Sequence, residues 1–144
     1  MEVIIRKFSL DDYERVLQLW RQCNLPLKPE GRDSLEEIRR QLELPQVIFL
    51  VAEKEGQVVG TVLATHDGRK GWINRLAVDP AFRGQGLGQL LVRAAERELE
   101  AAGLLMFAAL IEEDNLPSLR LFEKLGYTVH PDIKYFTRKK FPGA

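Results

Sequence analysis

Two spacings of apolar residues alternate along the chain and predict its secondary structure. Apolar positions that recur every three or four residues, framed by Ser, Asn, Pro or Gly, indicate amphipathic helices. Helices are expected over residues 10–22, 34–45, 87–102 and 115–125. Short runs rich in β-branched residues between turn residues indicate strands. Strands are expected over residues 3–7, 47–53, 58–65, 72–78 and 104–111, with a closing hairpin over 127–129 and 134–138.

The order of these elements predicts a mixed sheet. Residues 47–53 and 58–65 flank a tight turn and are expected to pair as an antiparallel hairpin. Residues 104–111 are almost wholly apolar, which is typical of a strand buried on both faces in a parallel pair. The strand over 72–78, the helix after it and this apolar strand then form a right-handed βαβ unit. The fold class is therefore α/β, with a sheet of mixed α+β character.

Length and charge narrow the class of protein. The 144 residues are enough for one domain, which we expect to span 1–144. Lys+Arg and Asp+Glu both number 21, so the net charge is zero and no nucleic-acid partner is expected. The sequence has neither an apolar run of membrane-spanning length nor a secretion signal, so we expect a cytoplasmic protein without a membrane partner. The single cysteine, Cys23, lies in an apolar helical pattern and is expected in the core.

A glycine-rich loop between a predicted strand and a predicted helix carries the clearest chemical signal. The loop Arg83-Gly84-Gln85-Gly86-Leu87-Gly88 follows the strand that ends at Val78. Glycines let the main chain adopt left-handed angles, so that N–H groups converge on one ligand near the positive end of a helix. We interpret the loop as a pocket for phosphate or pyrophosphate, to which Arg83 adds a formal charge. A glycine-rich turn without a ligand is the alternative. The spacing fits neither a P-loop nor a dinucleotide fingerprint.

Two motifs resemble those of one enzyme family. R-x-x-G-x-G at residues 83–88, after a strand ending in Leu-Ala-Val-Asp-Pro, resembles the acyl-CoA signature of the GCN5-related N-acetyltransferases, the GNAT superfamily. Residues 115–127 are similar to a second family pattern, N-x-x-A-x-x-[LF]-Y-x-x-x-G-[FY], and the order of elements agrees over nearly the whole chain. The resemblance implies about four helices around a mostly antiparallel sheet whose parallel pair splays apart. It also implies acetyl-CoA as cosubstrate.

The resemblance also assigns residues to the cofactor. Backbone groups of the strand would pair with the pantetheine arm as though it were an added strand, and the loop amides would surround the pyrophosphate. The residues assigned are Leu76, Ala77 and Val78 on the strand, Arg83, Gly84, Gln85, Gly86, Leu87 and Gly88 in the loop, and Asn115, Ser118 and Lys124 in the second motif. For Asn115, a simple helix cap is the alternative, and the two roles are compatible.

The positions that transfer protons in relatives depart from the family pattern. Phe122 stands where the family has a tyrosine that can protonate the departing thiolate, and a phenyl ring has no proton to give. Neither position that carries a glutamate base in relatives holds one here. The catalytic residues are therefore unassigned. Candidates are Tyr127 as proton donor, with packing as its alternative role, and Glu112 or Glu113 as a base acting through water, with a solvated loop as the alternative.

Two functions follow from the resemblance. The first is an N-acetyltransferase that moves an acetyl group from acetyl-CoA to a primary amine by direct attack in a ternary complex. The second is a non-catalytic acyl-CoA-binding sensor or interaction module. The acceptor, a small-molecule or peptide amine, would lie beside the loop over 24–33 and the turn over 130–133, with Asn74 or Arg75 shaping its site. Two histidines without clustered cysteines predict no metal site. A monomer or a homodimer is expected.

Overall fold

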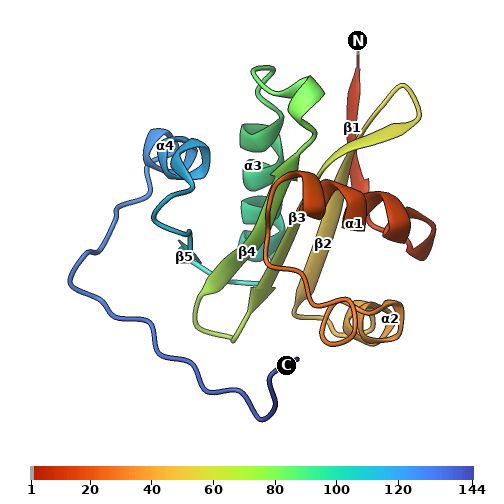
Figure 1. Ribbon diagram of the computed structural model, residues 1–144. Coiled ribbons are helices and arrows are strands. Elements are labelled where there is room, and N and C mark those ends of the chain that lie inside the picture. The colour runs from red at the N-terminus through yellow and green to blue at the C-terminus, as the bar shows by residue number, and fades with distance from the viewer. Residues whose placement is uncertain (1) are drawn as a thin grey trace.

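The computed structural model describes residues 2–144 and contains a mixed sheet covered by helices on both faces (Figure 1). The strands in this part of the chain are β1 (Val3–Lys7), β2 (Val47–Lys54), β3 (Gln57–His66), β4 (Gly71–Val78) and β5 (Phe107–Ala109). They lie in sequence order, and all neighbours are antiparallel except β4 and β5, which are parallel. The helices are α1 (Tyr13–Gln22), α2 (Leu35–Leu42), α3 (Leu87–Ala101) and α4 (Leu116–Lys124), with 3-10 turns η1 (Leu10–Asp12) and η2 (Pro80–Phe82). The predicted fold class is confirmed.

Each face of the sheet carries its own apolar cluster. On one face α3 packs against β2, β3 and β4, with Leu91 and Leu99 fully buried. On the other face α1 and α2 cover the sheet, and Trp20 stacks on Phe49 with ring centroids 5.9 Å apart. The sheet is therefore buried from both sides through its centre, which keeps β4 rigid where it borders the site described below.

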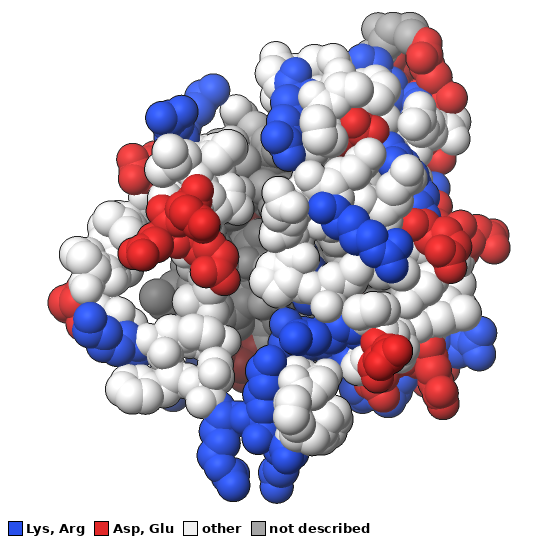
Figure 2. Space-filling view, in the orientation of Figure 1, with Lys and Arg blue, Asp and Glu red and all other residues white. Residues whose placement is uncertain are grey.

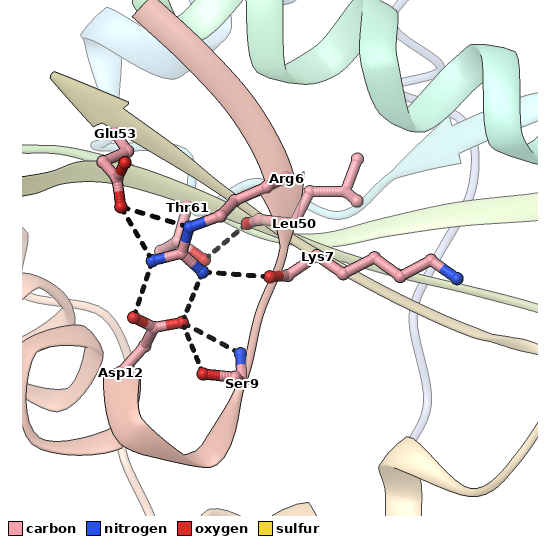
Figure 3. A network of polar contacts seen from close by, with 7 residues as sticks. All are labelled: Arg6, Lys7, Ser9, Asp12, Leu50, Glu53 and Thr61. Carbon is pink, nitrogen blue, oxygen red and sulfur yellow. Dashed lines mark hydrogen bonds and ion pairs between the residues drawn. The ribbon is translucent and has the colours of Figure 1, made fainter. Parts of the chain in front are cut away.

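A network of polar contacts fixes the edge strand β1 (Figure 3). The Arg6 guanidinium donates to both carboxylate oxygens of Asp12 at 2.9 Å and to Glu53 of β2 at 3.2 Å. Asp12 also accepts from the Ser9 backbone N–H at 2.9 Å, which closes the capping box at the start of η1. The hydrogen bonds from Arg6 hold the pKa of the Asp12 carboxyl below its usual range, because they favour its charged form.

A β-bulge in β4 reverses which side chains face which cluster. Leu63 pairs with Arg75 and Ala64 pairs with Ile73, so Asn74 is an extra residue on β4. Ile73, before the bulge, packs in the cluster under α3. Arg75, after it, is buried on the α1 face, where its guanidinium lies 4.5 Å from the Trp20 ring. Simple alternation would have left both side chains on one face of the sheet.

The carboxyl end of the chain differs from the sequence prediction. The predicted hairpin over 127–129 and 134–138 is wrong, because no residue of that segment pairs with a strand. The predicted strand over 104–111 shrinks to β5, and it is not buried on both faces: Leu105 is 92% exposed. In Figure 1 the chain after α4 runs away from β5 in an extended path.

The physical reason is that an apolar, β-branched pattern specifies extended backbone but not a pairing partner. Phe136 is 88% exposed, and the backbone hydrogen bonds within the segment close only short turns, at Ile133 and at Ala144. Pro131 interrupts the pattern between the two predicted strands and donates no ladder hydrogen bond. The segment therefore has strand-like conformation without a ladder.

Candidate functional site

A cavity of about 580 Å³ opens where β4 and β5 separate. Its walls come from the end of β4, the loop over 83–88, the start of α4 and the segment that follows α1. Of the residues that sequence motifs nominated, the cavity lining includes Leu76, Ala77, Val78, Arg83, Gly84, Gly86, Leu87, Gly88, Glu112, Asn115, Ser118 and Lys124. The side chains of Gln85, Glu113 and Tyr127 are not part of that lining. Segments far apart in sequence thus meet at one hollow.

The cavity side of β4 presents backbone groups with no strand partner. The β4–β5 ladder covers only Gly71 to Ile73, so the second half of β4 is unpaired along that edge in the described chain. The Asp79 N–H donates to the Val59 carbonyl of β3 at 2.8 Å, and the Val78 carbonyl of the same peptide therefore points the other way. Because orientation repeats every two residues, the N–H and C=O groups of Leu76 and Val78 face the cavity. They form a ready edge for an extended ligand.

The glycine loop supplies a cradle of N–H groups at one end of the cavity. Gly84 and Gly86 have φ of 80° and 78°, the left-handed conformation that L side chains rarely adopt. Gly86 is the N-cap of α3, whose first intrahelical bond runs from Leu90 N–H to its carbonyl at 3.1 Å. The N–H groups of the first turn therefore have no acceptor within the helix and carry the positive end of its dipole. This arrangement fits a pyrophosphate.

The loop is held in place by contacts of Asp79, which no sequence motif indicated. Asp79 accepts a 2.9 Å hydrogen bond from the Ala81 N–H and forms an ion pair with Arg15 of α1. The Ala81 N–H, then the Arg15 guanidinium, hold the pKa of the Asp79 carboxyl below its usual range. This ion pair ties the start of η2, which precedes the glycines, to α1.

The Arg83 side chain folds back over the cavity wall. Its Nε donates to the Val78 carbonyl at 3.4 Å, and its Nη2 lies 3.5 Å from Cys23 Sγ. The prediction that Cys23 belongs to the core is therefore wrong in part: the thiol is half-buried and lines the cavity, 3.5 Å from the Val78 carbonyl. The Val78 carbonyl is thus contacted by the side chains of both Arg83 and Cys23.

The start of α4 forms the opposite wall. Asn115 is the N-cap of α4, and its Oδ1 accepts from the Ser118 N–H at 3.3 Å. Glu112 lines the cavity, whereas the adjacent Glu113 does not. Both carboxylates are exposed. Asn115 therefore both caps α4 and lies on the cavity wall. These two roles are compatible, as expected from the sequence.

Tyr127 and Phe122 lie elsewhere, on a wider groove along β5 and α4 of about 1160 Å³. The Tyr127 hydroxyl donates a 2.6 Å hydrogen bond to Glu96, a buried residue of α3 that also pairs with Arg93 at 2.7 Å. Burial first, and then this hydrogen bond, raise the pKa of Tyr127. Phe122 is buried and packs edge-on against the Tyr127 ring at 4.9 Å. Both aromatic residues serve packing in this structure.

The described residues offer neither a metal site nor a helix that could span a membrane. Residues 2–144 contain no group of three or more His, Cys, Asp or Glu side chains arranged to hold a metal ion. None of the helices in that range is long and apolar enough to cross a membrane. On the face drawn in Figure 2, Lys and Arg side chains alternate with Asp and Glu, so neither sign dominates that face.

Comparisons with known proteins agree with the resemblance of the motifs. The profile of the acetyltransferase (GNAT) family matches residues 13–127. An acetyltransferase of Photorhabdus laumondii is 41% identical over 123 residues, which cover 85% of each chain.

Solved structures share the fold. The PaiA N-acetyltransferase of Thermoplasma acidophilum, in complex with coenzyme A, has a TM-score of 0.75 at 20% identity and covers 90% of this chain and 92% of its own. An aminoglycoside N-acetyltransferase bound to a bisubstrate analogue, CoA joined to monomethyl-acetylneamine, has a TM-score of 0.81 at 19% identity and covers 96% and 99%. The predicted family resemblance and fold are confirmed.

Proposed function

This chain belongs to the GNAT acetyltransferase family and uses acetyl-CoA, and from that premise we propose that it acetylates a primary amine of a small molecule. The amine attacks the thioester carbon directly, within a ternary complex. The single observation that carries the proposal is the cavity in which the free edge of β4 and the N-terminal cradle of α3 meet. A strand edge suits the pantetheine arm, and the cradle suits the pyrophosphate.

Different residues of the cavity bind different parts of acetyl-CoA. Leu76 and Val78 offer backbone N–H and C=O groups to the pantetheine arm, with Ala77 between them. Arg83 releases its contact with the Val78 carbonyl and turns its guanidinium toward the pyrophosphate, which it complements in charge. Lys124 and the Asn115–Ser118 turn complete the opposite wall. These contacts hold the thioester beside the splay, where proximity lowers the barrier to attack.

The reaction requires modest proton chemistry. The amine nitrogen forms a bond to the carbonyl carbon, the carbon–sulfur bond breaks, and the amine proton is lost while the CoA thiolate gains one. A thiol with a pKa of about 8.5 is a good leaving group, so the missing tyrosine at Phe122 does not block the step. We leave Tyr127 out of the proposed proton path because its hydroxyl already donates to Glu96. Solvent protonates the thiolate.

Glu112 is our candidate for the base, acting through a water molecule. It lines the cavity, whereas Glu113, its neighbour in sequence, does not. The two residues therefore form a matched pair of variants, Glu112→Gln and Glu113→Gln. We expect Glu112→Gln to lower kcat by roughly 10²-fold, as loss of a general base does, and Glu113→Gln to leave kcat unchanged. Equal rates in the two variants would remove Glu112 from the proposal.

Support for a small-molecule acceptor comes from the fold neighbours. One of them is bound to a CoA–acetylneamine analogue, so that fold accommodates an amino sugar beside the cofactor. In this chain Asn24, Leu25 and Pro26 border the cavity on the acceptor side, and none of them is charged, whereas Glu112 and Asp114 line the opposite wall. We therefore propose that the amine lies between an uncharged wall and these two carboxylates.

The proposal is tested by following thiol release from acetyl-CoA with a panel of amines. The panel contains neamine, spermidine, lysine and a peptide with a free N-terminus. Amine-dependent release of CoA with at least one class supports the proposal. Tight acetyl-CoA binding without thiol release with any of them would support the alternative, a non-catalytic binding module.

A further inference from the structure

We propose that Arg75 is a positioning residue for the amine acceptor: its buried ion pair with Asp33 holds segment 24–34 as the acceptor-side wall of the cavity. The inference rests on the proposed function and adds the residue that orders the amine site. Arg75 does not line the cavity, so it acts through the segment and is not a catalytic residue.

The pair is sealed from water. Arg75 Nη1 lies 3.0 Å from Asp33 Oδ1, and the two side chains are 9% and 4% exposed. Nη1 has no hydrogen-bond partner, so the contact is an ion pair rather than a directed hydrogen bond. The guanidinium also lies 4.5 Å from the Trp20 ring centroid, which adds a cation–π contact from α1. A buried pair of this kind contributes little net stability but is costly to break on one side only.

Asp33 transmits that constraint to residues 28–33 and to α1. Its second carboxylate oxygen accepts the Lys28 backbone N–H at 2.8 Å, and its own N–H donates to the Lys28 carbonyl at 3.0 Å. Its carbonyl accepts the Tyr13 hydroxyl at 2.7 Å. One aspartate therefore closes the turn over 28–33 and joins it to α1. The segment has no ladder hydrogen bonds, so these contacts shape it together with the short turns that the Gly31 and Ser34 N–H groups close.

The same strand bulge connects this pair to the cavity. Asn74 is the extra residue, and it turns Arg75 onto the α1 face while the next residue, Leu76, lines the cavity. The beginning of the segment, Asn24 to Pro26, lines the same cavity from across β4. The Arg75–Asp33 pair joins β4 to the segment and therefore sets the distance between the free edge of β4 and the acceptor wall. A stability role alone would not require this location.

The test compares variants of the pair with a variant of a second, less buried ion pair. Arg75→Met removes the guanidinium, Asp33→Asn keeps the shape of the carboxyl, and Arg75→Lys keeps the charge. Arg75→Met combined with Asp33→Leu removes both charges and guards against a variant that fails to fold because one buried charge is unpaired. Arg6→Met is the control, because it breaks the Arg6–Asp12 pair at β1 (Figure 3), remote from the cavity.

Two readouts separate positioning from general stability. Amide hydrogen exchange over 24–34 should accelerate by about tenfold or more in Asp33→Asn and in the double variant, while β2 and β3 stay protected. With the best amine from the panel, the KM for the amine should rise by about tenfold or more, while the Kd for acetyl-CoA by calorimetry and kcat change little. Arg75→Lys should recover part of the loss, and Arg6→Met should show neither effect.

Unchanged exchange over 24–34, or a loss of acetyl-CoA affinity that parallels the rise in amine KM, would overturn the inference. A wild-type protein that binds acetyl-CoA but acetylates no amine would instead refute the proposed function. The exchange measurement needs no amine, so the two failures are distinguishable.

Discussion

Replacing Gly86 by alanine isolates the backbone conformation of the loop from any steric effect. Gly86 has φ of 78°, and a Cβ built there would meet no atom within 4 Å. The added methyl group therefore costs only the penalty of the left-handed conformation, about 1–2 kcal/mol for an L residue. In the free protein the loop can relax to avoid that strain. Binding then has to restore the cradle, and the affinity for acetyl-CoA should fall by about 5- to 30-fold.

Gly68 provides the matched control. It has φ of 84° in the turn between β3 and β4, also with no atom within 4 Å of a Cβ, and it does not line the cavity. Gly68→Ala should lower the melting temperature by about 2–8 °C, as 1–2 kcal/mol does in a domain of this size. Its acetyl-CoA Kd should stay within about twofold of wild type, as for a surface change away from the site.

Titration calorimetry with acetyl-CoA and thermal melting compare the two variants. We expect an affinity loss in Gly86→Ala alone, with a melting temperature close to that of wild type because the free loop relaxes. If Gly86→Ala melts like wild type and still binds acetyl-CoA as tightly as Gly68→Ala does, the left-handed cradle has no part in binding.

Three further changes test single contacts. Asn115→Ala should lower the free energy of unfolding, measured by urea denaturation, by about 1 kcal/mol through loss of the α4 cap. It should also raise the Kd for acetyl-CoA measured by calorimetry; a cap role alone would leave that Kd unchanged. Arg6 lowers the pKa of Asp12, so the stability that this pair adds is complete above the ordinary carboxyl value of 3.8 and is lost as the pH falls through the lower folded value. In Asp12→Asn the free energy of unfolding, measured by urea denaturation, should depend less on pH in the acidic range. An unaltered dependence on pH would show that the Arg6–Asp12 pair does not contribute this stability. Tyr127→Phe should cost about 1–3 kcal/mol by leaving buried Glu96 short of a donor, with the rate of thiol release unchanged; a large loss of rate in folded protein would restore Tyr127 as a proton donor.

Local periodicity was sufficient to predict most of the fold. Helices and strands follow from the spacing of apolar residues, and the parallel pair follows from the apolar run after α3. The glycine loop and the motif at Asn115 nominated residues that the fold gathers around one cavity. These signals lie within short stretches of sequence, where neighbours along the chain determine the conformation.

Long-range pairing could not be predicted in the same way. The ion pairs Arg15–Asp79 and Arg75–Asp33 join residues more than forty positions apart, and no local pattern links them. The bulge at Asn74 adds one residue to a strand whose alternation looked regular. For this reason the sequence suggested that Arg75 could shape the acceptor site but not that it would be buried behind a loop.

The chain after α4 illustrates a different limit. Residues such as Ile133, Tyr135 and Phe136 have the composition of a strand, and the backbone there is extended. A strand also needs a partner edge at the correct register, and composition does not specify one. The apolar side chains remain exposed as a result.

In the function proposed above, the free edge of β4 and the loop over 83–88 together hold acetyl-CoA. Amide hydrogen exchange with and without saturating acetyl-CoA examines this binding mode, because the bound cofactor supplies acceptors to particular amides. We expect slower exchange at Leu76, at Val78 and across residues 84–88, with β1 and β2 unaffected. Binding that leaves those amides exchanging as in the free protein, or that protects a different segment, would contradict it.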